Sequence, residues 1–285
     1  MASHNHPHEP KRQQSGFTLV ELIMVIVILG VIGGTVAVFM KGPIDAYFAT
    51  ARRAGIADVA DTTVRRMARD IRKALPNSIR LGGTQCIEFI PTRMGGRYRA
   101  QDIVPSPSDN TGLRFDIADN RFNMLGINTA PIPADQRILI GDVVVVYNLG
   151  IDGASAYAGN NTATVSAVGV SPANANETQI DISSALPFPL ESPTRRFHVI
   201  PKEEQIVSYT CAGGKLYRSN TNYAYTTSCP APTVGTTPII ASEAGCTFAY
   251  DASDIRNGLV KLSLTFSSAG ESVSVYHEVH VNNTP

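Results

Sequence analysis

A glycine, a phenylalanine and a glutamate near the N-terminus are the residues whose types and spacing are best suited to chemistry. Gly16 and Phe17 mark an abrupt change from a polar run to an apolar one, and Glu21 is the only ionisable side chain from Phe17 to Met40. A carboxylate in a membrane span costs about 2.5–3.5 kcal/mol at mid-helix and usually marks function. If the chain is cut after Gly16, the new α-amine of Phe17 is a cation four residues before Glu21. Because a buried carboxylate needs a partner, we expect Glu21 to pair with such an amine from a neighbouring copy. The alternative is a Glu21 that only reaches the membrane interface.

The apolar segment from Phe17 to Met40 must position this junction. At about 1.5 Å per residue, a helix of this length spans roughly 36 Å, enough to cross a hydrocarbon core of about 30 Å with some tilt. A secretory signal has a shorter apolar core, of about 7–15 residues, and its cleavage site follows that core. Here the small residue precedes the apolar run, and Lys11 and Arg12 favour retention on the cytoplasmic side. The sequence therefore predicts a leader at residues 1–16 and a transmembrane segment at residues 17–41 that stays on the mature protein.

The hexapeptide Gly16-Phe17-Thr18-Leu19-Val20-Glu21 with its long apolar continuation resembles the cleavage and methylation signature of type IV prepilins. This resemblance implies that a prepilin peptidase cuts between Gly16 and Phe17 and N-methylates Phe17. It also implies that Glu21 guides docking of the subunit into a helical fibre, with other major and minor pilins and an inner-membrane assembly platform as partners. Pseudopilins of type II secretion carry the same signature.

The helix is expected to continue through residues 42–76 as an amphipathic segment. Pro43 follows Gly42 and predicts a kink or a short break where the chain leaves the bilayer. Beyond it, apolar residues recur at three- and four-residue spacing, and arginines occupy other faces. This stripe consists of Ile56, Val59, Thr63, Met67, Ile71 and Ala74. We expect the stripe to pack against a sheet, although a basic amphipathic helix also suits anionic lipid, and we expect Pro76 to stop the helix.

From residue 77 to 285 the apolar period changes to two, which predicts a β-rich head. The candidate strands are residues 86–90, 97–102, 113–116, 142–147, 162–168, 178–182, 197–200, 205–211, 215–218, 246–250, 259–266 and 272–281. Strand 205–211 is expected to form a hairpin with 215–218, and 259–266 with 272–281. Asn148–Asn161 and Thr221–Thr237 are expected to be long surface loops.

These elements together predict an α+β, type IV pilin-like fold, in which the long N-terminal helix packs on an antiparallel sheet. A small β subdomain inserted around residues 100–195 is the alternative to a single head domain. The order of helix, early Cys-x-Glu-Phe strand, central hairpin and C-terminal hairpin resembles J-type minor pseudopilins and large minor pilins. Three segments carry this resemblance, which is greatest for minor prepilin-like proteins of the mannose-sensitive haemagglutinin (MSHA) pilus: residues 86–89, 95–99 and 277–283.

This second resemblance implies a structural subunit of low copy number that serves in initiation of a pilus or at its tip. A pseudopilin of a secretion machine is the alternative. The protein would lie in the bacterial inner membrane as a single-pass protein with its head in the periplasm, and later in the pilus at the cell surface.

Four cysteines follow the apolar segment and therefore lie in an oxidising compartment in this interpretation. There is no C-x-x-C motif, which argues against a zinc ribbon or a thioredoxin-like site. We expect one bridge, Cys211–Cys229, to close the loop after the central hairpin. A second, Cys86–Cys246, would tie the first strand of the head to the C-terminal sheet. A Cys229–Cys246 bridge and four buried free thiols remain as alternatives.

Other chemistry has little support in this sequence. The 24 basic and 24 acidic residues balance, so no electrostatic case exists for binding nucleic acid. Neither a G-x-S-x-G motif nor a Walker loop is present. His277 and His280 are three residues apart in an alternating strand and should face opposite sides, so both cannot ligate one metal ion. We therefore expect neither a cofactor nor an enzyme, and an anchored periplasmic enzyme is the hypothesis that the sequence supports least.

Two further parts of the sequence contain residue types that bind metal ions. His4, His6 and His8 alternate within the expected leader and would be discarded with it. The oxygen-rich segments 109–110 and 116–120 have donors for calcium but lack the spacing of an EF-hand loop. We expect these segments to be solvated surface.

Overall fold

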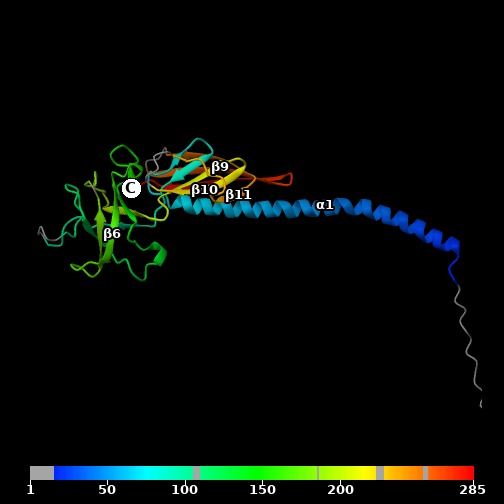
Figure 1. The fold of residues 1–285 in the computed structure, drawn as a ribbon, viewed down its shortest axis with the longest axis horizontal. Coiled ribbons are helices and arrows are strands. Elements are labelled where there is room, and N and C mark those ends of the chain that lie inside the picture. Colours follow the sequence, from blue (N-terminus) through cyan, green and yellow to red (C-terminus); the bar gives the residue numbers. More distant parts are fainter. Residues whose placement is uncertain (1–15, 105–109, 185, 223–227, 253–255) are drawn as a thin grey trace, which may run out of the picture. The chain divides into compact units, whose positions relative to one another are not determined.

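The computed structural model describes residues 16–104, 110–184, 186–222, 228–252 and 256–285. The chain forms two compact units, one up to Arg52 and one from Arg53 to Pro285. Helix α1 (Leu19–Arg72) supplies most of the first unit and its last turns belong to the second. The second unit also contains three antiparallel sheets, which Figure 1 shows in sequence colours. The α+β prediction is confirmed.

Of the kink or short break predicted at Gly42-Pro43, the break is wrong, because α1 is continuous from Leu19 to Arg72 with Pro43 inside it. Pro43 has no N–H to donate to the preceding turn, but the turns on either side keep their own hydrogen bonds and hold the helical geometry. The helix ends at Arg72, about one turn before Pro76.

The last turns of α1 pack on a sheet, as the apolar stripe predicts. Their buried residues are Ile56, Ala60, Thr63, Val64, Met67, Ala68 and Ile71. Val59 was predicted to belong to the buried stripe but is 47% exposed. The next residue, Ala60, is fully buried in its place. One helical turn of 3.6 residues after Ile56 ends between Val59 and Ala60, so either residue could face the sheet. The small side chain of Ala60 lets the helix approach the sheet closely.

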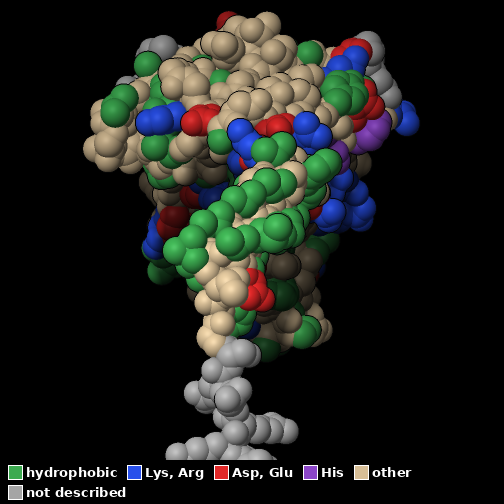
Figure 2. Space-filling model, turned by 90° about the vertical axis from the view of Figure 1, so that its right-hand side faces the viewer, with side chains coloured by type: hydrophobic (Ala, Val, Ile, Leu, Met, Phe, Trp, Pro, Cys, Tyr) green, Lys and Arg blue, Asp and Glu red, His purple; other side chains and the backbone are tan. Residues whose placement is uncertain are grey.

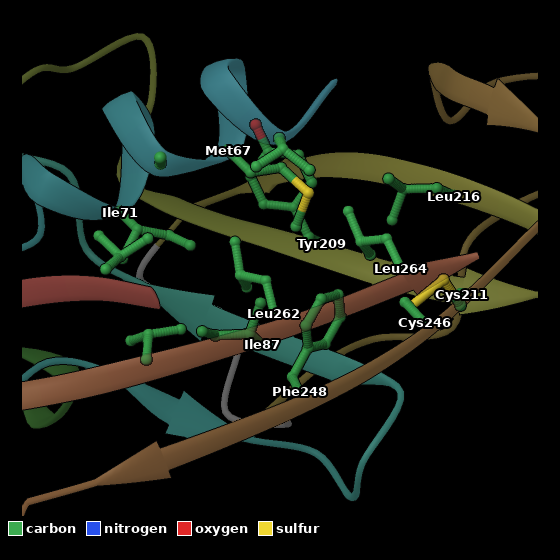
Figure 3. Packing of buried hydrophobic residues seen from close by; sticks show 14 of the residues in the cluster. Met67, Ile71, Ile87, Tyr209, Cys211, Leu216, Cys246, Phe248, Leu262 and Leu264 are labelled. Atoms are coloured by element: carbon green, nitrogen blue, oxygen red, sulfur yellow. A yellow bond between two sulfur atoms is a disulfide. The ribbon is translucent and has the colours of Figure 1, made fainter. Parts of the chain in front are cut away.

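Two of the sheets enclose the main core together with α1. The five-stranded sheet has the order β1 (Arg80–Leu81), β2 (Cys86–Phe89), β9 (Ile206–Ala212), β10 (Lys215–Thr221), β11 (Ile239–Ser242). The three-stranded sheet has the order β12 (Ala244–Asp251), β13 (Asn257–Ser268), β14 (Glu271–Asn282). Figure 3 shows Met67 and Ile71 of α1 packing with Tyr209 of β9, and with Phe248 and Leu262 from the three-stranded sheet. The β9–β10 and β13–β14 hairpins confirm the two predicted hairpins.

The third sheet is made by the chain between β2 and β9. Its order is β3 (Met94–Arg97), β8 (Arg196–Ile200), β5 (Val143–Val146), β6 (Thr162–Val170), β7 (Glu177–Ser183), β4 (Arg121–Leu125). The two edge strands meet, since Tyr98 bridges to Met124 and the N–H of Arg99 donates to the carbonyl of Asn123 at 2.8 Å. The sheet therefore curves into a nearly closed barrel around its own core, in which Phe122 and Phe197 pack edge to face.

Differences from the predicted strands lie mostly in this barrel. The expected strand 113–116 is absent, and β3 ends at Arg97, where the expected strand 97–102 begins. Three short strands, β1, β4 and β11, were not predicted. The predicted surface loop Asn148–Asn161 is wrong in part, because Asn148 and Asn161 are buried and Asn148 donates to the carbonyl of Pro76 at 2.6 Å. Part of the other predicted loop, residues 223–227, lies outside the described residues.

Both predicted disulfides are wrong. The structure pairs Cys86 with Cys229 and Cys211 with Cys246. The reason is the register of β2 against β9, in which Cys86 lies opposite Thr210. Directly opposite side chains share a face, and successive residues alternate, so Cys211 points away from Cys86. Cys211 therefore faces the core, where Cys246 of the three-stranded sheet lies (Figure 3), and Cys86 faces the segment that follows β10.

Candidate processing and assembly site

The junction between Gly16 and Phe17 lies in irregular backbone immediately before α1. Residues 16–18 form neither helix nor strand, and the Phe17 side chain is 83% exposed. A β-carbon at Gly16 would meet no atom of the described chain within 4 Å. The fold therefore places no steric demand for glycine at this position. If glycine is required there, the demand comes from a molecule that binds the junction.

Thr18 starts the helix and was missed as a functional residue in the sequence. The Thr18 carbonyl accepts hydrogen bonds from the N–H groups of Glu21 and Leu22 at 3.1 and 3.2 Å, and its Oγ1 accepts from the Glu21 N–H at 3.3 Å. Thr18 is thus the N-cap, and Glu21 is the third residue of the helix. The spacing Thr-x-x-Glu is that of a capping box, a signal that the sequence does contain. The helix consequently begins directly after the junction.

Glu21 lies exposed in the first turn of α1. It makes no side-chain hydrogen bond or ion pair to any residue that the structure describes. The helix dipole favours a carboxylate at this end of a helix. In Figure 2 the apolar side chains of the first part of α1 form a nearly continuous green band, and an acidic side chain, in red, lies beside the end of this band. The first turn therefore presents Phe17, Thr18 and Glu21 together, with the carboxylate available to a group outside the chain.

The apolar side chains of α1 up to Met40 are exposed throughout. By length and composition, α1 is the one helix among the described residues that could cross a membrane. Gly30, Gly33 and Gly34 lie within it, and a β-carbon at any of them would meet no other part of the described chain. A surface of this kind needs lipid or apolar partners to cover it.

The metal-binding candidates do not converge. His277 lies on the half-buried face of β14 and His280 on its exposed face, so the expected separation of the two is confirmed. The buried Asp119 holds its own loop, since its carboxylate accepts the N–H groups of Arg114 and Asn120 at 2.8 Å each. Within the described ranges, no group of three His, Cys, Asp or Glu side chains could hold a metal ion. Asp109 and the histidines of the expected leader lie outside the described residues.

Comparison with known proteins bears on this site. A family model described as a prokaryotic N-terminal methylation motif matches residues 11–37, which span the junction, the cap and Glu21. The chain carries a prepilin-type methylation motif. This motif indicates a prepilin of the type IV pilin or pseudopilin kind, hence a structural subunit that is processed by a prepilin peptidase and assembles with other pilins. It also fits membrane anchoring by α1. No curated protein and no solved structure matches the chain.

Proposed function

We propose that this protein is a minor pilin of an MSHA-type type IV pilus, similar to the minor prepilin-like protein MshO, and that it acts in initiation of the pilus or at its tip. The observation that carries the proposal is the matched motif at residues 11–37, followed in the chain by a large head with separate hydrophobic cores. In this proposal the domains are a leader at 1–16, a transmembrane half-helix at 17–41, an amphipathic half-helix at 42–76 and a head at 77–285. The barrel between β2 and β9 is its inserted subdomain.

Processing between Gly16 and Phe17, with methylation of the new amine, is the first part of the proposal. Exposed irregular backbone at the junction supports it, because a peptidase needs an accessible, non-helical substrate. Intact-mass measurement of the membrane-bound protein, with and without the peptidase, tests it. We expect a mature chain that begins with N-methylated Phe17. A mature N-terminus beyond Val38 would mean an ordinary signal peptide and would refute the proposal.

Glu21 is the proposed docking residue, and its exposed carboxylate supports this role. The capping geometry suggests a sharper test than alanine alone. Glutamine also serves at the third position of a capping box, so Glu21→Gln keeps the cap and removes the charge. We expect Glu21→Gln and Glu21→Ala alike to be cleaved and inserted but to be depleted in sheared pili. If Glu21→Gln assembles as well as the unchanged protein, the charge of Glu21 is not needed for assembly and docking by charge pairing is refuted.

The size of the head supports a minor subunit. Two sheets and an inserted barrel form the second unit, and in a helical fibre each head must share a limited circumference with its neighbours. A head of this size is best accommodated at an end of the fibre, where one side meets no partner. Quantitative mass spectrometry of purified pili should find only a few copies per fibre. An abundance equal to that of the principal pilin would overturn this part.

The orientation follows from the same proposal: the protein lies in the inner membrane with its head in the periplasm, then at the cell surface. The two disulfides support an oxidising compartment for the head. A J-type pseudopilin of a type II secretion system is the second candidate, because the matched motif is common to both classes. Deleting the gene for this protein distinguishes the two candidates. Loss of pili with normal protein secretion favours the minor pilin, and loss of secretion with normal pili favours the pseudopilin.

A further inference from the structure

An open groove lies between the last turns of α1 and the strand β14, within the second unit. Its volume is about 610 Å³. Ala57, Val64 and Ala68 of α1 and Val273 and Val275 of β14 form its apolar floor. Polar side chains form its rim: Asp61, Arg65, Arg69, Arg72 and His277.

The strand beside this groove lies at the edge of its sheet. β14 is the last strand of its sheet and pairs with β13 over all 12 of its residues with no shift of register. No strand pairs with its other side among the residues that the structure describes. Every second residue of an edge strand turns its N–H and C=O away from the sheet. Proteins usually blunt such an edge with charged side chains, especially lysine, with proline or with a bulge. β14 has no lysine, proline or bulge; of its two glutamates, Glu271 is paired with Arg53 of α1 at 2.6 Å and Glu278 lies on the face away from the groove. An edge of this length is therefore suited to accept another strand.

The charged side chains on the rim of the groove favour an occupant of opposite charge. Asp61 is paired with Arg65 at 2.7 Å, so these two charges offset each other. Arg69 and Arg72 are exposed and have no ion-pair partner within the described ranges. The rim is therefore net positive and favours an acidic occupant. A second copy placed edge to edge would bring like-charged rims together, which disfavours self-pairing.

We propose that β14 accepts an extended acidic segment of a different subunit as an additional strand. The groove-facing side chains of that segment, every second residue, would include apolar ones on the floor formed by Ala57, Val64 and Val275 and acidic ones that meet Arg69 and Arg72. The helix rises about 22 Å from Ala57 to Arg72, which matches about six or seven residues of a strand. The identification of the partner as a subunit rests on the proposed function, whereas strand acceptance is measured independently of it.

A synthetic peptide tests the groove in the full chain, purified in detergent. The probe is a labelled seven-residue peptide with blocked ends, which carries valine and glutamate at its four groove-facing positions and serine at the three positions between them. We expect it to bind, and to slow hydrogen exchange of amides in β14. The same peptide with lysine in place of each glutamate should bind at least about tenfold more weakly. The valine–glutamate peptide with methyl groups on alternate backbone nitrogens should also lose binding, because it cannot donate to the strand.

Matched variants locate the site. Arg69→Glu combined with Arg72→Glu should weaken the acidic peptide at least about tenfold. Arg66→Glu, on the same helix and exposed but outside the groove, should have little effect. Val275→Lys places a charge on the groove side of β14 and should abolish binding, whereas Ser274→Lys, on the opposite face, should not. Unchanged far-ultraviolet circular dichroism is required of every variant.

Three results would overturn the inference. Equal binding of the N-methylated peptide, or unprotected β14 amides, would show that no strand is added. Protection of β14 that rises with protein concentration in the absence of peptide would assign the edge to a second copy. Failure of the peptide to bind, with binding of phosphatidylglycerol vesicles that Arg69→Glu abolishes, would assign the rim to lipid. None of these results alters cleavage at Gly16-Phe17, so failure here is distinct from failure of the proposed function.

Discussion

The carboxylate of Asp70 ties the end of α1 to the five-stranded sheet by hydrogen bonds. Removing the hydroxyl oxygen of one of its partners, Tyr209, should measure how much this attachment stabilises the head. Asp70 Oδ2 accepts a hydrogen bond from the Tyr209 hydroxyl at 2.7 Å and another from Arg218 Nε at 3.0 Å. Arg218 also donates to both carboxylate oxygens of Glu204, at 2.7 and 3.0 Å. Tyr209 is fully buried. Burial raises its pKa, as does the neighbouring Asp70, so the hydroxyl keeps its proton at neutral pH and remains the donor.

Tyr209→Phe removes the hydroxyl and keeps the ring, so that it leaves no large cavity. A hydrogen bond to a charged group contributes about 1.5–3 kcal/mol. Since Asp70 keeps Arg218, we expect a loss near the lower limit, about 1.5–2 kcal/mol. In a head of this size, such a loss lowers Tm by roughly 3–8 °C. Tyr217 of the adjacent strand is the matched control, because it is also buried and its hydroxyl has no hydrogen-bond partner among the described residues.

Urea denaturation at pH 7 of the full chain in detergent would measure both variants. Tyr217→Phe should change the free energy of unfolding by less than about 0.5 kcal/mol. A double-mutant cycle with Asp70→Asn should give a coupling energy of at least about 0.5 kcal/mol between Asp70 and Tyr209. If Tyr209→Phe is no more destabilising than Tyr217→Phe, or if the coupling is zero, the hydroxyl does not hold the helix to the sheet.

Three further predictions concern the head. Replacing Cys211 and Cys246 together by alanine opens a loop with a sequence separation of 35. By chain entropy this should cost up to about 4 kcal/mol in denaturation experiments, and non-reducing peptide maps should show this pair linked. Burial lowers the pKa of His198 to about 4 from an ordinary 6.5. As pH drops, the imidazole of His198 is therefore protonated in the unfolded chain before it is protonated in the folded one. The free energy of unfolding should fall between about pH 6.5 and about pH 4. His198→Gln should remove that part of the pH dependence of the urea midpoint. The hydrogen bond from Arg99 lowers the pKa of Glu177, so its contribution is present above the ordinary pKa and is lost in acid. Glu177→Gln should therefore narrow the difference in stability between pH 7 and pH 3.

The sequence predicts those parts of the fold that local periodicity determines. The alternation from Val273 to Val281 and the stripe from Ile56 to Ile71 are readable because each element buries one continuous face. The short strands β4 and β11 are not readable in this way, because β4 buries three consecutive residues and β11 only one, so neither shows the alternation of a half-buried strand. Disulfide pairing needs the register of β2 against β9, which joins residues more than a hundred positions apart and has no local signal.

The candidate site is more readable than the fold. The junction at Gly16-Phe17 and the isolated Glu21 stand out because composition changes abruptly there. The cap at Thr18 follows from the Thr-x-x-Glu spacing, which is a local signal. The groove beside β14 was not predicted, since it depends on which strand is left at the edge of a sheet. That outcome is decided by the whole topology.

The direct pairing of β2 with β9 has a consequence for how this head can change in evolution. Phe89 lies opposite Val207, so the chain leaves for the barrel and returns from it at neighbouring points of one sheet. Two adjacent antiparallel strands can also be joined by a short hairpin. The barrel is therefore inserted between two adjacent strands that connecting segments of very different length, from a short turn to a whole domain, can join with the same backbone geometry. The part of the chain that packs with α1 can stay constant while the inserted module is replaced, so that relatives with one helix and one hairpin core can carry unrelated outer domains.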